Sequence, residues 1–258
     1  MDSSLQTPSL DPELAVLLSH ASPPPTPTSI LEQREVTKGY ISELQEKLRP
    51  SLPAESAYRV EDHFVPVDGG EIVARCLVPT EERNAPNGQF RVLVWFHGGG
   101  FCDGSLHIDD FYLRKICVKY NVAVVNVEYR LAPEFPFPTS VNDAYAALKW
   151  TAENASLLSA SISRGFIVAG VSAGGNLAAA VALRARDDPF FTGRKLSGQI
   201  LQIPQVIHPD AKPEQYKSQL LSLEINKDAP FLTRDNIDRY IVLERRPIRP
   251  RILRPFSK

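Results

Sequence analysis

The chain of 258 residues is 43% hydrophobic and 23% charged, with a formal net charge of −1 at pH 7. This composition is typical of a globular protein, and the near-zero charge argues against nucleic-acid binding, which needs a basic face to hold phosphates. The three cysteines are odd in number and lack C-x-x-C spacing, so we expect no disulfide framework. The sequence shows no secretory signal and no run of 18 apolar residues, which favours a cytoplasmic protein without a membrane span.

The first 57 residues are predicted to form a helical arm. Asp11 is a candidate N-cap for a helix that runs to His20, because apolar residues recur there at helical spacing. The proline-rich stretch 22–28 interrupts the helical pattern and is typical of an exposed linker. Helical periodicity then returns over 29–48 and stops before the next proline.

From Tyr58 onward the pattern changes to strands alternating with helices. Segments of strand character flank Asp68-Gly69-Gly70, which predicts a β-hairpin. Further strands are expected over 91–96, 122–127, 164–170 and 198–207, and helices over 108–120, 141–154 and 175–186. Strands and helices that alternate in this way form a largely parallel sheet with right-handed crossovers. The fold class is therefore predicted to be α/β.

The C-terminal part is expected to add a lid and a tail. Residues 212–243 are mostly polar with helical spacing, and we interpret them as a lid or cap segment. Residues 245–258 include six basic residues, three prolines and no acidic residue, which is typical of a disordered tail. The predicted organisation is an arm over 1–57, a body over 58–243 and a tail over 244–258.

A serine stands between small residues where a predicted strand meets a predicted helix. The stretch 170-GVSAG-174 matches G-x-S-x-G, with Ser172 at its centre. A serine on so sharp a turn has a strained backbone, and its neighbours must be small for the chain to pass. The N-terminus of the following helix favours negative charge nearby. Ser172 is therefore a candidate nucleophile.

A second motif, 97-HGGGF-101, follows the predicted strand 91–96 directly. Three consecutive glycines leave backbone N–H groups unshielded, and such groups stabilise the oxyanion that forms during acyl transfer. The alternative is a flexible glycine turn without a catalytic role. Because this motif and the serine motif follow two different strands of one sheet, the pair favours the catalytic interpretation.

Three motifs in this order carry a resemblance to a known family. They are 97-HGGGF-101, 129-YRLAPEFPFP-138 and 170-GVSAGGN-176, and Asp143 also fits the pattern. The chain resembles the α/β-hydrolases of the hormone-sensitive-lipase type, over roughly 58–240. The resemblance covers the predicted body and implies an α/β-hydrolase fold with an N-terminal helical cap.

The same resemblance implies a site and a reaction. Ser172 is the expected nucleophile, and the N–H groups of Gly99, Gly100 and Ala173 are the expected oxyanion hole. His97 is implied to anchor the glycine loop and not to act as a base. The implied substrate is a short- to medium-chain carboxylic ester. The sequence shows no metal-ligand cluster, P-loop or dinucleotide motif, so we expect no metal and no cofactor.

The residues that should activate the serine are not identifiable in the sequence. In this fold a carboxylate and then a histidine follow the serine along the chain. His208 is the sole histidine after Ser172, and we favour a loop histidine over a triad base for it. Asp228, Asp235 and Asp238 are interpreted as solvated charges. Neither activating partner of the serine is therefore assigned.

The resemblance fades near Leu243, and we expect a chain truncated at its C-terminus. The expected loss is about two strands and a helix of the sheet, together with the acid and the histidine. The remaining strand would leave an exposed sheet edge, which favours self-association. The alternatives to an esterase are a non-catalytic member that binds a small apolar ligand and an inactive truncated product.

Overall fold

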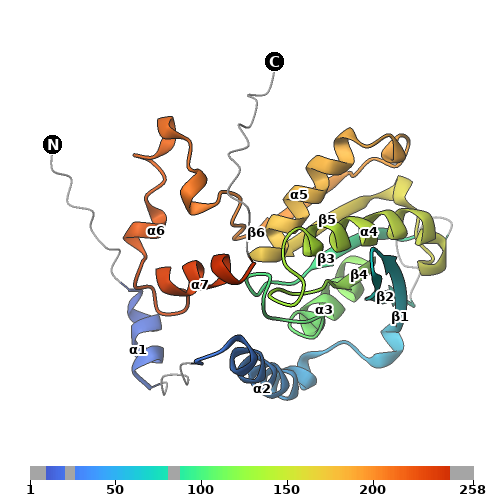
Figure 1. The fold of residues 1–258 in the computed structure, drawn as a ribbon. Helices are drawn as coiled ribbons and strands as arrows, with labels where there is room; N and C mark the ends of the chain where they lie inside the picture. Colours follow the sequence, from blue (N-terminus) through green and yellow to red (C-terminus); the bar gives the residue numbers. More distant parts are fainter. Residues whose placement is uncertain (1–9, 21–26, 81–87, 245–258) are drawn as a thin grey trace.

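The computed structural model describes residues 10–20, 27–80 and 88–244. A six-stranded sheet with the order β1-β2-β4-β3-β5-β6 forms the centre of the molecule (Figure 1). Strands β4, β3, β5 and β6 are mutually parallel, and β1 and β2 run antiparallel at one edge. The prediction of an α/β fold with a mostly parallel central sheet is confirmed.

The antiparallel edge is the hairpin that the sequence predicts. Strands β1 (Tyr58–Val67) and β2 (Gly70–Pro79) pair along their whole length, with Val67 opposite Gly70. The turn between them is Asp68-Gly69, and Gly69 has a φ of +76°. Asp-Gly is the residue pair that favours two-residue hairpin turns, because the glycine accepts a positive φ without steric cost.

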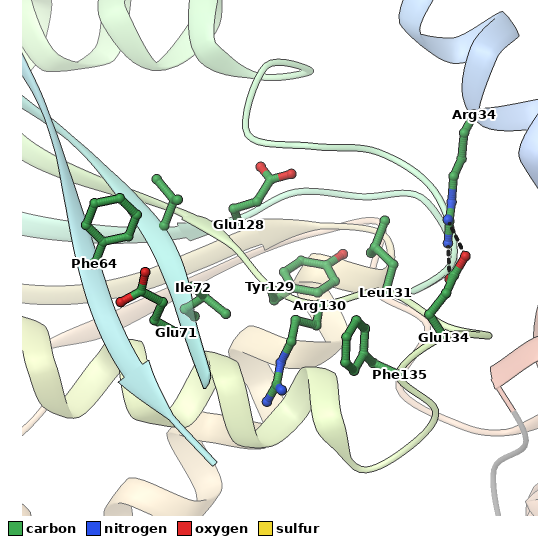
Figure 2. Close-up of a pocket in the computed structure, with 11 residues that line it drawn as sticks. Arg34, Phe64, Glu71, Ile72, Glu128, Tyr129, Arg130, Leu131, Glu134 and Phe135 are labelled. Atoms are coloured by element: carbon green, nitrogen blue, oxygen red, sulfur yellow. Dashed lines mark hydrogen bonds and ion pairs between the residues drawn. The ribbon is translucent and has the colours of Figure 1, made fainter. Parts of the chain in front are cut away.

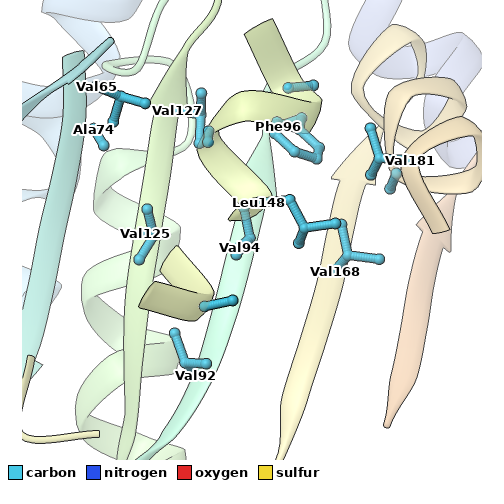
Figure 3. Close-up of a cluster of buried hydrophobic side chains, with 14 of the residues drawn as sticks. Val65, Ala74, Val92, Val94, Phe96, Val125, Val127, Leu148, Val168 and Val181 are labelled. Carbon is cyan, nitrogen blue, oxygen red and sulfur yellow. The ribbon is translucent and has the colours of Figure 1, made fainter. Parts of the chain in front are cut away.

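The interior strands β3 (Arg91–Phe96), β4 (Val122–Glu128) and β5 (Phe166–Val171) are buried on both faces of the sheet. Successive side chains of a strand point to opposite faces, so alternate residues enter different cores. On β3, Val92, Val94 and Phe96 belong to the larger core (Figure 3). Leu93 and Trp95 belong to the smaller core on the other face. Continuous apolar runs are therefore what these strands require.

Helices cover both faces of the sheet (Figure 1). The smaller core receives side chains from α3 (Asp110–Tyr120), and the larger core receives them from α4 (Thr139–Asn154) and α5 (Ala173–Asp187). All three helices lie where the sequence predicts them, with ends that differ by two residues or fewer. Because β3, β4, β5 and β6 are parallel, their carboxyl ends lie together at one end of the sheet.

The N-terminal arm holds two helices, α1 (Pro12–His20) and α2 (Ile30–Leu48). Asp11 accepts the N–H of Glu13 at 2.9 Å and so caps α1 as predicted. Ser29 accepts the N–H of Glu32 at 3.1 Å and caps α2. Most of the predicted linker, at 22–26, lies outside the described residues. The two predicted helices of the arm are confirmed.

The sequence overestimates regular structure after residue 202. Strand β6 (Gly198–Gln202) ends five residues before the predicted end, because Ile203 has a φ of +39° and Pro204 has no N–H to donate to a ladder. Within the predicted lid, α-helix is limited to α6 (Ser222–Ile225) and α7 (Arg234–Glu244). Turns, bends and one short 3₁₀ segment, Glu214–Tyr216, account for the rest of the lid. The predicted tail beyond Glu244 lies outside the described residues.

Membrane association through a spanning helix finds no support in the described part of the chain. Of the helices over 10–20, 27–80 and 88–244, none combines the length and the apolarity that crossing a bilayer requires.

Candidate active site

Ser172 occupies the sharp turn between β5 and α5. Its φ of +54° and ψ of −115° are strained for a residue with a side chain. Two backbone hydrogen bonds hold this conformation: Ser172 N–H donates to the Gln202 carbonyl at 2.9 Å, and the Ser172 carbonyl accepts from Asn176 N–H at 3.0 Å. The turn therefore has the geometry that the sequence predicts for a nucleophile elbow.

The two glycines of the serine motif are required by space. A Cβ on Gly174 would lie 1.9 Å from the Phe96 carbonyl oxygen, at the end of the neighbouring strand β3. A Cβ on Gly170 would lie 2.4 Å from the backbone of Gly174. Contacts this short require the backbone to move, so any larger residue would displace the turn that carries Ser172.

The glycine loop lies directly beside the serine. A Cβ on Gly98 would be 3.5 Å from Ser172 Cβ, which places the start of the loop against the elbow. Gly100 has a φ of +60°, and a Cβ there would lie 2.6 Å from the Tyr240 ring of α7. The loop is therefore enclosed between the elbow on one side and α7 on the other.

Three backbone N–H groups of the two motifs find no acceptor among the described residues. Over the ranges that the structure describes, the amides of Gly99, Gly100 and Ala173 donate no hydrogen bond. Ala173 is the first residue of α5, and a first-turn amide has no acceptor within its own helix. Of the three predicted oxyanion-hole residues, Gly99 and Gly100 follow Gly98 on the glycine loop, and Ala173 follows Ser172 at the start of α5.

His97 holds the start of the glycine loop through contacts with Gly98 and Tyr129. Its ring is fully buried, its Nδ1 donates to the Gly98 carbonyl at 2.7 Å, and it stacks on Tyr129 with ring centroids 4.3 Å apart. The Tyr129 hydroxyl in turn donates to the His97 carbonyl at 2.9 Å. Burial lowers the pKa of His97 to about 4, so the imidazole is neutral near pH 7. An enclosed, neutral imidazole supports the anchoring role that the family resemblance implies.

An ion pair that the sequence pattern did not predict holds the loop 129–138 in place. Asp143 of α4 is buried and accepts from Arg130 Nε at 2.9 Å and from Nη2 at 2.7 Å. The same guanidinium donates to the Asp68 carbonyl in the β1–β2 turn at 2.9 Å. Figure 2 shows Tyr129 and Arg130 at the start of this loop, with Glu134 further along it beside Arg34. The family pattern at Asp143 therefore marks a structural contact.

A cavity of about 600 Å³ opens on Ser172. Nearly all of its remaining lining comes from the segment between β6 and the middle of α7. Those residues are Ile203, Pro204, Gln205, Val206, Ile207, Pro209, Lys212, Leu220, Ser222, Leu223, Asn226, Leu232 and Ile237. Most of them are apolar, as expected of a small-molecule site. The predicted lid supplies part of this wall, but its individual residues were not assigned from the sequence.

The usual activating partners of a serine are missing from the described lining of this cavity. Its described lining includes no histidine, aspartate or glutamate. His208 sits between two lining residues, yet its Nδ1 accepts the N–H of Asp210 at 3.2 Å and so caps a 3₁₀ turn. Asp238 pairs with Arg234 at 2.8 Å on the surface of α7. The geometry therefore favours the interpretation of His208 as a loop histidine.

The described residues also offer no metal site. Among residues 10–20, 27–80 and 88–244, no group of three or more histidine, cysteine or acidic side chains is arranged to hold an ion. Cys102 lies close to the glycine loop, and burial raises the pKa of its thiol to about 12. It is therefore a protonated, buried side chain and not a reactive thiolate.

Comparison with known proteins identifies the family. Residues 93–249 match the family described as alpha/beta hydrolase fold. Carboxylesterase NlhH of Mycobacterium tuberculosis is 37% identical over 236 residues, covering 91% of this chain. The chain therefore belongs to the α/β-hydrolase fold family, in its hormone-sensitive-lipase type.

Solved structures agree with this assignment. The crystal structure of vibralactone cyclase superposes with a TM-score of 0.87 and 39% identity, covering 97% of this chain and 72% of its own. An esterase of Pyrobaculum calidifontis superposes with a TM-score of 0.74 and 32% identity, covering 91% of this chain and 69% of its own. The chain spans 64–66% of the length of the first curated relatives that it matches.

Proposed function

We propose that this chain binds short- to medium-chain carboxylic esters and accepts their acyl group on Ser172. The observation that carries the proposal is the strained Ser172 against the glycine loop, together with the amides of Gly99, Gly100 and Ala173, which donate no hydrogen bond within the described residues. The largely apolar cavity of about 600 Å³ supports an ester substrate over a charged one. Relatives named carboxylesterase and esterase support the same reaction class.

The proposed reaction has two stages, acylation of the serine and hydrolysis of the acyl-serine. Ser172 Oγ attacks the ester carbonyl, whose oxygen becomes an oxyanion held by the N–H groups of Gly99, Gly100 and Ala173. The C–O bond to the alcohol then breaks, and the alcohol leaves with the proton that the serine hydroxyl has lost. Water next cleaves the acyl-serine ester, which releases the carboxylic acid and restores the serine. Because no histidine or carboxylate lines the described cavity, we expect proton transfer to limit both steps.

The proposal is tested by hydrolysis of p-nitrophenyl butyrate with and without added imidazole. Imidazole can take the place of a missing base, so the parent chain should hydrolyse the ester faster than Ser172→Ala, and more so as imidazole increases. Ser222→Ala is the matched control, because Ser222 lines the same cavity away from the glycine loop. Equal rates for the parent chain and Ser172→Ala at every imidazole concentration would refute the proposed nucleophile.

A second candidate is a non-catalytic protein that binds a small apolar ligand in the same cavity. The lining without a histidine or carboxylate favours it, since a binding site needs no proton acceptor. Fluorescence titration with a non-hydrolysable ester analogue separates the two candidates. Saturable binding together with Ser172-independent hydrolysis would favour the binding protein.

Two further proposals concern the self-association of the chain and the compartment in which it resides. Strand β6 forms a sheet edge, and Ile200 on it is 48% exposed, which supports association of two copies through this edge. Sedimentation of the parent chain and of Ile200→Lys tests this, since a charge on the edge should weaken the association.

Cys76, Cys102 and Cys117 are all free thiols, which supports a reducing compartment such as the cytoplasm.

A further inference from the structure

Arg34 of helix α2, in the N-terminal arm, contacts both the segment after the glycine loop and the loop 129–138. Arg34 Nε donates to the Cys102 carbonyl at 2.8 Å, and Nη2 donates to the Ala132 carbonyl at 2.8 Å. The guanidinium also pairs with both carboxylate oxygens of Glu134, at 2.8 and 2.9 Å (Figure 2). A planar guanidinium with several fixed donors suits such a multiple contact. Arg34 thus joins the segment after the glycine loop to the loop 129–138.

A second contact comes from the next turn of the same helix. Thr37 Oγ1 donates to Asp103 Oδ2 at 2.6 Å. The other oxygen of this buried carboxylate, Oδ1, accepts the N–H of Gly104 at 2.7 Å. Residues three apart on a helix share one face, so Arg34 and Thr37 hold neighbouring residues of one turn.

That turn fixes the orientation of a candidate oxyanion-hole amide. The Gly99 carbonyl accepts the N–H of Cys102 at 3.1 Å and the N–H of Asp103 at 2.9 Å. The Gly99 carbonyl and the Gly100 N–H belong to one planar trans peptide unit, so they point in opposite directions. Holding Cys102 and Asp103 in place therefore also holds the direction of the Gly100 N–H.

We propose that Arg34 and Thr37 are positioning residues that keep the Gly100 N–H directed toward the Ser172 site. The inference rests on the proposed acyl-transfer function of that site. The arm acts on the reaction through the turn 99–103, and neither side chain lines the cavity on Ser172. Loss of either contact is expected to loosen the turn, which weakens oxyanion stabilisation and leaves the substrate cavity unchanged.

Hydrogen–deuterium exchange tests the proposal without requiring activity. In Arg34→Ala, amide exchange in a peptide over 98–104 should rise at least about tenfold, while a peptide from β4 keeps its protection. Thr37→Val should give a smaller rise at the same peptide, and Thr37→Ser should restore protection. Arg186→Ala is the matched control, because Arg186 pairs with Asp187 on the exposed end of α5.

Kinetics provide the second readout, with imidazole present and p-nitrophenyl butyrate as substrate. Arg34→Ala should lower kcat about tenfold with KM within about twofold, and Glu134→Gln should change neither, because Arg34 keeps its two carbonyl contacts. Unchanged exchange at 98–104 in both Arg34→Ala and Thr37→Val would overturn the proposal. If Ser172→Ala is as fast as the parent chain, the proposed function fails, and the exchange experiment alone still decides whether α2 holds the turn.

Discussion

The two walls of the candidate site are built differently. On the wall formed by the glycine loop and the elbow, His97 is fully buried and Phe101 and Ala173 are nearly so, while Gly99, Gly100 and Ser172 are half-buried. The opposite wall comes from the segment after β6. Between residues 192 and 243, all of which the structure describes, none is buried. The core therefore holds the turn that carries Ser172, while a segment of partly exposed residues lines the cavity.

The largest expected effect is a loss of folding on the core side. Gly174→Ala places a methyl group 1.9 Å from the Phe96 carbonyl, so the elbow and β3 cannot keep their spacing. We expect the free energy of unfolding to fall by more than about 4 kcal/mol, measured by urea denaturation. Gly198→Ala is the matched control, because a Cβ there meets nothing within 4 Å. Equal stability of the two variants would show that the elbow is not tightly packed.

A pH-dependent effect on the same side comes next. Burial lowers the pKa of His97 from 6.5 to about 4. Between these two pH values, His97 therefore binds a proton in the unfolded chain but not in the folded chain. The stability contributed by neutral His97 is present above about pH 6.5 and is lost as the pH falls toward 4. His97→Asn keeps a donor for the Gly98 carbonyl but does not titrate. The difference in unfolding free energy between parent and variant should therefore change by roughly 3 kcal/mol across this window. A constant difference would contradict the buried, neutral imidazole.

The smallest effect on stability is expected on the ligand wall. Ile203 lines the cavity and is 80% exposed, so Ile203→Ser should change the unfolding free energy by less than about 0.5 kcal/mol. The same change removes apolar surface from the cavity. With imidazole present, the preference for p-nitrophenyl butyrate over the acetate should fall about fivefold. A loss of stability comparable to that of a core variant would show that this wall is packed like the other.

The same difference explains what sequence patterns predict well. The strands β3, β4 and β5 have continuous apolar runs because both faces of the sheet are covered, and this pattern identifies them within one or two residues. The two glycine-containing motifs are also visible, since a strained serine and a close backbone approach leave few alternatives to glycine. The structure places Ser172 on a strained turn and the start of the glycine loop against it, as the motifs indicate.

Contacts between distant segments were not predictable in this way. The bond from Arg34 to the Cys102 carbonyl joins residues 68 apart, and nothing in the spacing of either segment indicates it. The cavity-lining residues after Gln202 were not predicted, because the apolar run there is typical of a longer strand. In the structure, Ile203 and Pro204 end the strand ladder at Gln202. Among the described residues after Gln202, none belongs to either hydrophobic core, and it is packing against a core that gives a sequence its hydrophobic period. The catalytic roles of the four site residues stay predictions.

Peptide mapping by mass spectrometry tests the central claim, that Ser172 is the acyl acceptor, most directly. The chain would be incubated with p-nitrophenyl butyrate, quenched in acid and digested, with Ser172→Ala and Ser222→Ala treated in parallel. We predict a butyryl group on Ser172 in the parent chain and in Ser222→Ala, and no acylated serine in Ser172→Ala. An unmodified Ser172, or butyrylation confined to lysines and equal in all three proteins, would contradict the account.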